Sequence, residues 1–506
     1  METTTNNANA PDMKLFWGCF IALTATSFGF IARVLTASEW GAEFGLSQTE
    51  VGEILGVGLW PFAISIILFS LIIDKIGYKA AMYVGLACHS LSTLLILTAN
   101  GYWGMYLGTL VLALGSGTVE AYINPVVATI FNKDKTKWLN ILHAGWPGGL
   151  VVGGILAILL GPEVSWRFKI GLITIPTIVY AIMLWNKQFP MQERVAAGVS
   201  YKDMLKEVGA VGALIIATLI VLEVGRVFNF GLGLELVLII ILTAIYAFYT
   251  RSVGRPLFIL LLLIMMPLAT TELGVDSWIT SLMEGEMGKL GLNAGWVLVY
   301  TSAIMMALRF YAGPIVHRLS PLGLLATCSI IAALGLIFLS KATGVTILLA
   351  ATLYGLGKTF FWPTTLGVVA EQFPKGGALT LNAIAGVGML AVGIVGAPFL
   401  GYFQDQEVAK EIRAYDQEQG TELYDTYVTD QKRGVFGYYT SLDVKKAEDA
   451  PDTDKAPIGE IQAGAQKGAL STVAIFPIIM LLCYIGLMLY FRARGGYKPV
   501  DISSNE

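Results

Sequence analysis

Long apolar segments alternate with short polar ones along almost the whole chain. A helix that crosses a membrane needs about 20 consecutive, mostly apolar residues. Fourteen segments approach or exceed this length: 15–37, 51–73, 80–98, 103–131, 138–161, 167–187, 209–227, 231–250, 256–281, 293–316, 322–340, 344–372, 378–402 and 470–492. The pattern predicts an all-α membrane protein with fourteen spans.

The pattern of residues 126–140 recurs at 368–382 with a constant offset of 242. The shared positions are Val126, Val127, Ala128, Phe131, Leu139 and Asn140, repeated as Val368, Val369, Ala370, Phe373, Leu381 and Asn382. A second landmark, 70–75 against 313–318, keeps an offset of 243. Such periodic self-similarity is the mark of repeated structural units. We therefore expect two copies of one six-helix bundle.

The repeat divides the chain. Residues 1–187 form the N-terminal bundle, 188–255 a cytoplasmic linker and two extra spans, and 256–506 the C-terminal bundle. An insert at 403–468 interrupts the second copy before its last helix, with 14 acidic and 8 basic residues, a net charge of −6. The sequence leaves the fold of this insert and the role of the extra helices open.

Composition agrees with a lipid-embedded chain. Hydrophobic residues make up 55% and charged residues only 14%, where soluble proteins average about 25% charged. The 33 basic and 36 acidic residues leave no positive surplus for nucleic acid. Four cysteines in apolar runs and three scattered histidines predict neither a metal site nor a cofactor. We expect a monomer in the lipid bilayer.

Lysine and arginine in short loops mark the cytoplasmic side of a membrane protein. They gather in alternate loops and at the C-terminus: Lys75, Lys79, Lys133, Lys135, Lys137, Lys187, Arg194, Lys202, Lys206, Arg318, Arg492, Arg494 and Lys498. This pattern predicts a multi-pass protein of a plasma membrane of the bacterial inner-membrane type. Both termini would be cytoplasmic and the acidic insert outside.

The loop Asp74-Lys75-Ile76-Gly77-Tyr78-Lys79 resembles the loop motif of the major facilitator superfamily, commonly G-x-x-x-D-R-x-G-R-R. Gly313–Arg318 is similar to its degenerate second copy. Ser70, Lys75 and Tyr78 depart from the pattern. The resemblance implies two pseudo-symmetric six-helix bundles. It also implies a conformational role for Asp74, Lys75, Gly77, Gly313 and Arg318, which would pin the halves together in one state.

Within that superfamily, Glu120-Ala-Tyr-Ile-Asn124-Pro125 followed by Asn140 resembles the fucose:proton symporter branch. The resemblance implies that Glu120 is the proton-linked carboxylate and that Asn140 lies near the sugar-contacting region. Arg33 departs from it, since that branch has an acid in its first helix.

We single out six of the ionisable residues inside predicted spans: Arg33, Glu120, Glu272, Asp276, Arg309 and Lys358. Each costs about 2.5–3.5 kcal/mol near the bilayer centre, so such residues normally face a partner or a cavity. Three positive charges balance three negative ones, which suits a neutral solute that moves with a proton. The alternative is a set of structural pairs that fix helix register.

We therefore predict a proton-coupling set of Glu120, Arg33 and Lys358, in which Glu120 takes up a proton and pairs with either cation after releasing it. We also predict a solute site. Its residues are Asn124, Asn140, His143, Trp146, Glu272, Asp276, Arg309 and Trp362.

The leading prediction is a secondary active transporter for a small polar solute, a sugar, that works by proton symport with alternating access. One alternative is an organic-anion carrier with Arg33, Arg309 and Lys358 as carboxylate clamps. A second is a non-transporting receptor or scaffold that displays the insert. An enzyme is not expected, because no nucleophile–base or metal set is visible. The solute and the stoichiometry stay open.

Overall fold

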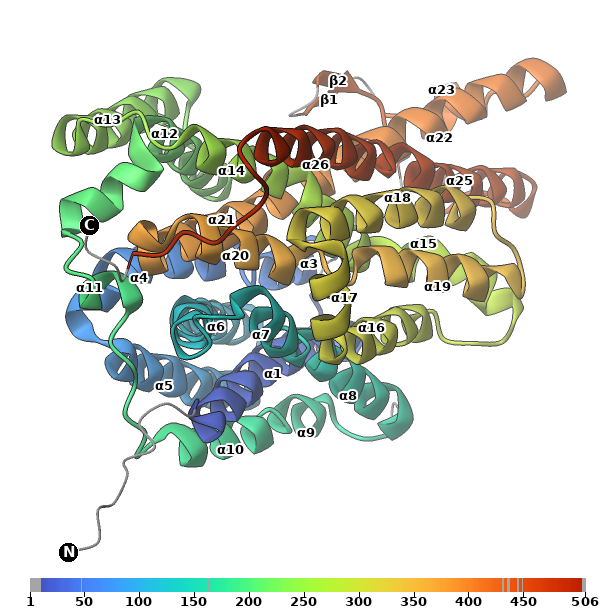
Figure 1. The fold of residues 1–506 in the computed structure, drawn as a ribbon. Coiled ribbons are helices and arrows are strands. Elements are labelled where there is room, and N and C mark those ends of the chain that lie inside the picture. The colour runs from blue at the N-terminus through green and yellow to red at the C-terminus, as the bar shows by residue number, and fades with distance from the viewer. Residues whose placement is uncertain are drawn as a thin grey trace, which may run out of the picture.

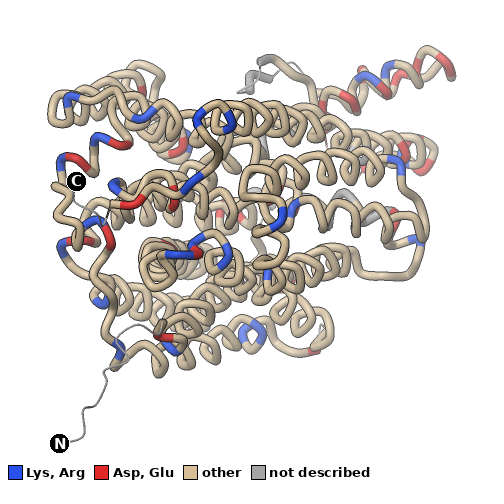
Figure 2. Tube along the Cα trace, viewed as in Figure 1, with Lys and Arg blue, Asp and Glu red and all other residues tan. Residues whose placement is uncertain are grey.

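The computed structural model describes residues 11–46, 48–161, 163–429, 432–434, 437–443, 446–447 and 449–502. These residues form a bundle of roughly parallel and antiparallel helices (Figure 1). Both ends of the described chain lie at one end of the bundle, which we call the terminal face. The tip of the insert projects from the other end, which we call the insert face. Lys, Arg, Asp and Glu concentrate toward these two ends (Figure 2).

The first group of helices covers residues 13–196. Its members are α1 (Met13–Leu35), α2 (Ala37–Glu43), α3 (Gln48–Gly56), α4 (Trp60–Ile76), α5 (Tyr78–Leu97), α6 (Tyr102–Ile130), α7 (Lys135–Leu142), α8 (Gly145–Leu160), α9 (Trp166–Gly171), α10 (Thr174–Leu184) and α11 (Glu193–Ala196). Helix α1 packs against α6, α8 and α10, and α4 packs against α5 and α6.

Two further helices, α12 (Tyr201–Phe228) and α13 (Leu232–Thr250), form a hairpin. Asn229 ends α12 in the left-handed conformation, which lets the chain reverse. Helix α12 packs against helices of the second group, α14 and α21. Very little of α13 is buried, and apart from Glu235 its side chains are mostly apolar. An apolar helix with so little burial is suited to face lipid.

The second group covers residues 256–493. Its members are α14 (Pro256–Ala269), the π-helix η1 (Thr270–Gly274), α15 (Val275–Lys289), α16 (Gly295–Phe310), α17 (Ala312–Leu319), α18 (Pro321–Leu339), α19 (Thr346–Lys358), α20 (Phe361–Gln372), η2 (Pro374–Gly376), α21 (Gly377–Ala391), the π-helix η3 (Val392–Gly396), α22 (Ala397–Gln419), α25 (Asp452–Val473) and α26 (Ile475–Ala493). It meets the first group where α21 packs on α4, α16 on α8 and α20 on α7.

Within the described residues, twelve helices are long and apolar enough to cross a membrane, or thirteen if one bent pair counts as a span. The bent pair is α16 and α17, which meet at 70°. The predicted count of fourteen is thus not confirmed. The segment predicted at 344–372 is broken at Thr359–Phe360 into α19 and α20, which are too short to qualify separately.

The insert largely continues two membrane helices. Helix α22 extends to Gln419 and α25 begins at Asp452, and between them lie α23 (Leu423–Tyr427) and a hairpin of β1 (Lys432–Gly434) and β2 (Gly437–Tyr439). The insert has a small core of its own, with the buried side chains Val408, Ile412, Leu423, Tyr427, Leu442 and Ile458.

Candidate functional site

A closed cavity lies between the two helix groups, with a volume of about 20 Å³. Its walls are Phe62, Glu120, His143, Trp146, Glu272, Leu273, Arg309, Trp362 and Met389. A water molecule needs about 10–15 Å³ of such space. The cavity therefore has room for about one water molecule and none for a solute.

Arg309 is the central cation of this cavity and is 1% exposed. Its guanidinium donates three hydrogen bonds: Nε to the carbonyl of Thr359 at 2.7 Å, one Nη to the carbonyl of His143 at 2.8 Å, and the other Nη to Glu272 Oε1 at 2.8 Å. The second oxygen of Glu272 accepts from the backbone N–H of Trp362 at 3.2 Å. A buried ion pair is tolerable when its remaining donors and acceptors are satisfied in this way.

Prolines explain why those two carbonyls can accept a side chain. A helical carbonyl normally accepts from the N–H four residues later, and proline has none. Pro147 stands four residues after His143, and Pro363 four residues after Thr359. Both carbonyls are therefore free to receive Arg309, and the one at Thr359 coincides with the break between α19 and α20.

A third proline makes a similar link elsewhere between the groups. Pro125 lies inside α6 and leaves the carbonyl of Ala121 without its helical donor. Asn382 of α21 donates its Nδ2 to that carbonyl at 3.0 Å. Two of the three carbonyls freed in this way, those of Ala121 and His143, belong to the first group and accept from the second. These bonds tie the groups together around the cavity.

Glu120 begins a hydrogen-bonded chain within the first group. It is 4% exposed, and Asn124 Nδ2 donates to its Oε2 at 2.7 Å. The other side of the Asn124 amide contacts His143, with Oδ1 at 2.9 Å from Nε2. Since the carbonyl of His143 accepts from Arg309, polar contacts run without a break from Glu120 to the Arg309–Glu272 pair.

Lys358 and Asp276 form a separate ion pair in the second group. The Lys358 ammonium also lies 3.4 Å from Thr301 Oγ1 and 5.1 Å from the centre of the Tyr354 ring. Neither charged residue lines the cavity. Asn140 likewise lies outside it and donates to Thr364 Oγ1 at 3.1 Å, a further bond between the two groups.

Arg33 lies near the insert-face end of α1 and is 4% exposed. Its Nε donates to the carbonyl of Gly29 at 3.0 Å, and its guanidinium packs against Gly58, just before α4. Among the described residues, Arg33 has no ion pair, and its buried Nη1 atom has no hydrogen-bond partner. Gly58 stands four residues before the cavity residue Phe62, toward the insert face. Arg33, which packs against Gly58, therefore lies on the insert-face side of the cavity.

The structure thus gathers six of the predicted solute and coupling residues at one cavity and separates the others. Those gathered are Glu120, His143, Trp146, Glu272, Arg309 and Trp362. Asn124 stands directly behind Glu120. In this structure Glu120 pairs with neither Arg33 nor Lys358. Sequence reasoning missed Phe62, Leu273 and Met389, because apolar residues in a membrane span give no signal of function. It also missed the role of the prolines, although their spacing from the freed carbonyls is visible in the sequence.

The loop motif lies at the terminal face. Asp74 pairs with Arg194 of α11, and the Lys75 ammonium lies 4.8 Å from the centre of the Tyr201 ring. Gly77 has φ of 82°, which favours glycine at this turn. In the second copy of the motif, Gly313 packs against the Lys137 side chain, and Arg318 is exposed.

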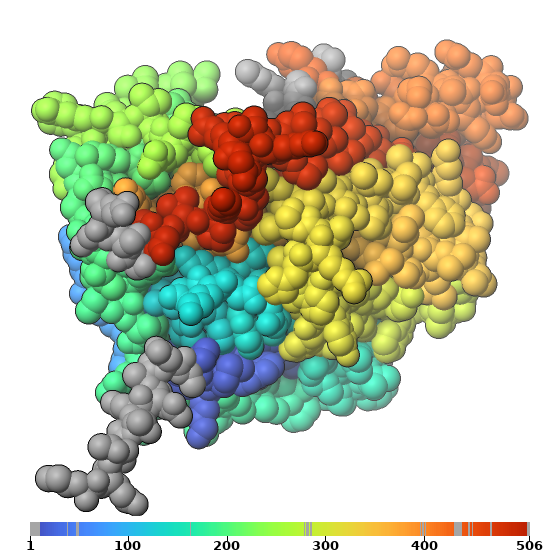
Figure 3. Space-filling model, in the orientation of Figure 1, coloured from blue at the N-terminus to red at the C-terminus, as the bar shows by residue number. Residues whose placement is uncertain are grey.

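The terminal face is closed by polar contacts between α7 and α20. Thr136 Oγ1 donates to Glu371 at 2.5 Å, and its N–H donates to the same oxygen at 3.3 Å. Lys135 Nζ donates to the carbonyl of Ala370 at 3.2 Å and to Glu193 at 2.6 Å. The C-terminal segment, red in Figure 3, lies back against the surface, where Tyr497 donates to Glu371 at 2.7 Å.

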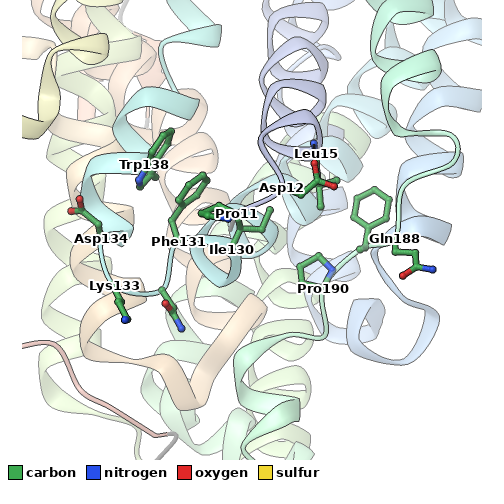
Figure 4. A pocket seen from close by; sticks show the side chains of 12 residues that line it. Pro11, Asp12, Leu15, Ile130, Phe131, Lys133, Asp134, Trp138, Gln188 and Pro190 are labelled. Atoms are coloured by element: carbon green, nitrogen blue, oxygen red, sulfur yellow. Dashed lines mark hydrogen bonds between the residues drawn. The ribbon is translucent and has the colours of Figure 1, made fainter. Parts of the chain in front are cut away.

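A larger groove of about 740 Å³ opens at the terminal face, away from these charges (Figure 4). Stacked rings of Phe131 and Trp138 form one wall, with 3.8 Å between centroids. At the other side Asp12 caps the start of α1 and pairs with Lys187. The groove contains none of the predicted coupling or solute residues, so its size alone does not make it the solute site.

A multi-pass helical bundle with buried ion pairs around a central cavity is typical of membrane transport proteins. The chain belongs to the Major Facilitator Superfamily, whose sequence profile matches residues 16–398. This finding confirms the resemblance stated from the loop motif. Members of this family are transporters, in line with the expectation that the chain is not an enzyme, and they carry small-molecule solutes.

Two curated relatives match part of the chain. It is 26% identical to the gentisate transporter of Corynebacterium glutamicum over 156 residues, 30% of this chain and 34% of the relative. It is 25% identical to the hexuronate transporter of Bacillus subtilis over 143 residues, 28% of this chain and 34% of the relative. The chain thus spans about a third of the length of the curated relatives that it matches.

Solved structures agree on the fold. The Escherichia coli fucose:proton symporter superposes with a TM-score of 0.52 at 15% identity, over 90% of this chain and 98% of that structure. This similarity supports the major facilitator fold.

Proposed function

We propose that this protein is a proton-coupled secondary transporter that moves a small organic anion by alternating access of its two helix groups. The observation that carries the proposal is the state of Arg33. Its guanidinium is buried, and its Nη1 has no partner among the described residues. An unpaired buried charge costs several kcal/mol. A solute carboxylate that binds Arg33 would supply the missing partner and both hydrogen-bond acceptors.

The other charges favour the same solute class. Arg309 is neutralised by Glu272, and Lys358 by Asp276. Of the six ionisable residues predicted inside the spans, this leaves Arg33 and Glu120 without an ionic partner among the described residues. When Glu120 takes up a proton, this set of six holds one uncompensated positive charge. One monoanion then restores neutrality, so proton and solute favour each other's binding.

The positions of these groups suggest an order of events. Arg33 lies on the insert-face side of the cavity, and Glu120 lines the cavity itself. An anion that enters from the insert face meets Arg33 first and then the protonated Glu120. Opening toward the terminal face separates α7 from α20, and loss of the proton from Glu120 removes the charge balance that held the anion.

The curated relatives support this solute class. The two described above are named for gentisate and hexuronate, which both bear a carboxylate. The rings of Trp146 and Trp362 at the cavity suit a solute with an apolar or ring-shaped face, such as an aromatic acid or a sugar acid.

Uptake into proteoliposomes tests the proposal. With an acid-outside pH gradient, we expect accumulation of a carboxylic acid from a panel of aromatic and sugar acids, and no uptake of the matching neutral amides and sugars. Arg33→Gln is expected to weaken acid binding at least about tenfold, since a hydrogen-bonded charge contact is worth about 1.5–3 kcal/mol. Lys341→Gln, a surface change at the end of α18, serves as the matched control.

A neutral sugar moving with a proton is the second candidate. The balance of three positive and three negative charges and the two tryptophan rings favour it. Uptake of a neutral sugar that acids do not inhibit, and that Arg33→Gln leaves unchanged, would refute the organic-anion proposal and support this one.

A further inference from the structure

A second cavity, of about 550 Å³, lies at the insert face where α12 meets the first helix group. Its polar and aromatic walls are Glu53 of α3, Trp60 of α4, Tyr102 and Tyr106 of α6, and Arg226 and Asn229 at the end of α12. None of these residues belongs to the central cavity. The cavity therefore has no part in the transport site described above.

One part of this cavity has the chemistry that recognises an ammonium group. Three aromatic rings share the wall, and those of Tyr102 and Tyr106 stack with centroids 5.6 Å apart. The faces of such rings attract cations, and clusters of them bind quaternary ammonium ligands. Tyr102 donates its hydroxyl to Glu53 at 2.7 Å, which fixes the carboxylate beside the rings. Within the described residues, Glu53 has no ion pair, so its negative charge is available to a ligand.

The other part has the chemistry that recognises a phosphate. Arg226 pairs with the buried Glu223 through Nε at 3.2 Å and one Nη at 2.6 Å. The pair holds the guanidinium in place, while its side chain stays 60% exposed. Among the described residues, no hydrogen bond occupies its other Nη group. Asn229 adds an amide to the same wall.

The location of the cavity indicates where such a ligand comes from. Helix α12 packs on α14 and α21 of the second group, whereas α3 and α6 belong to the first. The aromatic side chains of Trp60 and Phe228 meet edge to face at 6.5 Å across the gap. Helix α13, the partner of α12 in the hairpin, exposes mostly apolar side chains and is suited to face lipid. A lipid headgroup is therefore the source of ligand that we infer for a cavity at the insert-face end of α12.

We propose that this cavity binds a phosphate diester joined to an ammonium group, as in the headgroup of a zwitterionic phospholipid. The ammonium lies against Trp60, Tyr102 and Tyr106 with Glu53 as its counter-charge, and the phosphate contacts Arg226. The site exists only because the α12–α13 hairpin supplies the arginine, which gives the two extra helices a function. A bound headgroup bridges α12 and the first helix group at the insert face and stabilises their contact there.

Lipid retention measured by native mass spectrometry tests the proposal on the purified full chain. We expect phosphatidylethanolamine to be retained at least about fivefold better than phosphatidylglycerol, which has the phosphate but no ammonium. Glu53→Gln and Trp60→Leu are each expected to reduce that retention roughly fivefold or more. Trp103→Leu is the matched control, because Trp103 adjoins the same aromatic cluster, is 69% exposed and does not line the cavity.

Soluble glycerophosphoethanolamine separates the two sources of this headgroup. If it competes with the lipid and the same variants abolish the competition, the site takes free phosphodiesters as well. If only the lipid binds, the membrane is the source, and both outcomes support the site. Equal retention of phosphatidylglycerol, or unchanged retention in Glu53→Gln, would overturn the proposal. Glu53 is exposed, so its glutamine variant folds even if Trp60→Leu does not.

Discussion

Replacing Thr136 by valine removes a hydrogen bond that joins the two helix groups at the terminal face. The hydroxyl donates to Glu371 at 2.5 Å, while the backbone N–H of Thr136 donates at 3.3 Å and is kept by valine. Opening of this face must break the bond, because Thr136 is on α7 and Glu371 on α20. A hydrogen bond to a charged group is worth about 1.5–3 kcal/mol. Its loss should favour the open state by a factor of roughly 10–150.

Tyr497→Phe is the matched control. It removes a hydrogen bond of 2.7 Å to the same carboxylate. Glu371 belongs to the second helix group, and Tyr497 lies in the segment that follows α26 of the same group. We therefore expect this hydrogen bond to survive opening, and its loss should leave the equilibrium unchanged. Thr136→Ala repeats the loss of the hydroxyl without the extra methyl group of valine. This second variant separates the hydrogen bond from any packing effect against Gly367, which lies next to the hydroxyl.

Electron–electron distance measurements report the two states directly. Spin labels at Lys133 and Lys375, both exposed at the terminal face, sit on opposite helix groups once the four native cysteines are replaced. We expect Thr136→Val and Thr136→Ala to move population to a longer distance, and Tyr497→Phe to match the parent protein. Equal shifts in all three variants, or none in either Thr136 variant, would refute the assignment of this bond as a closure contact.

Three other changes test separate contacts. Gly367→Ala puts a Cβ 2.3 Å from a neighbouring hydroxyl, which overpacks the site by about 1–3 kcal/mol. We expect this variant to open the terminal face in the same distance measurement. Gly486→Ala is the control, because its Cβ meets nothing within 4 Å and should leave the distance unchanged. Glu272→Gln leaves Arg309 buried without its counter-charge and should lower the free energy of unfolding by about 3–5 kcal/mol. Adding Arg309→Met should recover part of that stability. If the effects of the two substitutions simply add, the two residues do not stabilise the protein as a pair. Glu120→Gln should still exchange solute across the membrane of liposomes. It should lose the accumulation of solute, roughly tenfold, that a pH difference of about one unit provides for each proton carried. Normal accumulation in this variant would exclude Glu120 as the coupling residue.

Several features of this protein could be predicted from residue order alone. The alternation of apolar and polar segments indicates the membrane class, and the loop at Asp74 indicates the family, which the family match confirms. Burial of charge in lipid is so costly that the few ionisable residues in the spans are informative without a structure. Six of the residues predicted from the sequence line one cavity. Some of them were chosen for their charge and the others as neighbouring aromatic or polar groups.

The pairing of those charges could not be predicted in the same way. Arg309 was expected among solute ligands, but each of its three guanidinium nitrogens already donates a hydrogen bond, to Glu272 or to the carbonyls of His143 and Thr359. Sequence spacing shows that Pro147 and Pro363 free those carbonyls, yet it does not show which distant side chain reaches them. The number of spans also depends on where helices break, and the break at Thr359–Phe360 accompanies such a contact.

By itself the sequence determined which solvent each segment faces, because transfer of a residue between water and lipid is a local property of that residue. It also determined the candidates for chemistry, since charge in an apolar span is visible in one dimension. Only the tertiary structure decided that Arg309 and Lys358 each have a carboxylate partner, while Arg33 has none in the part of the chain that the structure describes. Ion pairing depends on distances between helices that are remote in sequence, and only the packed structure fixes those distances.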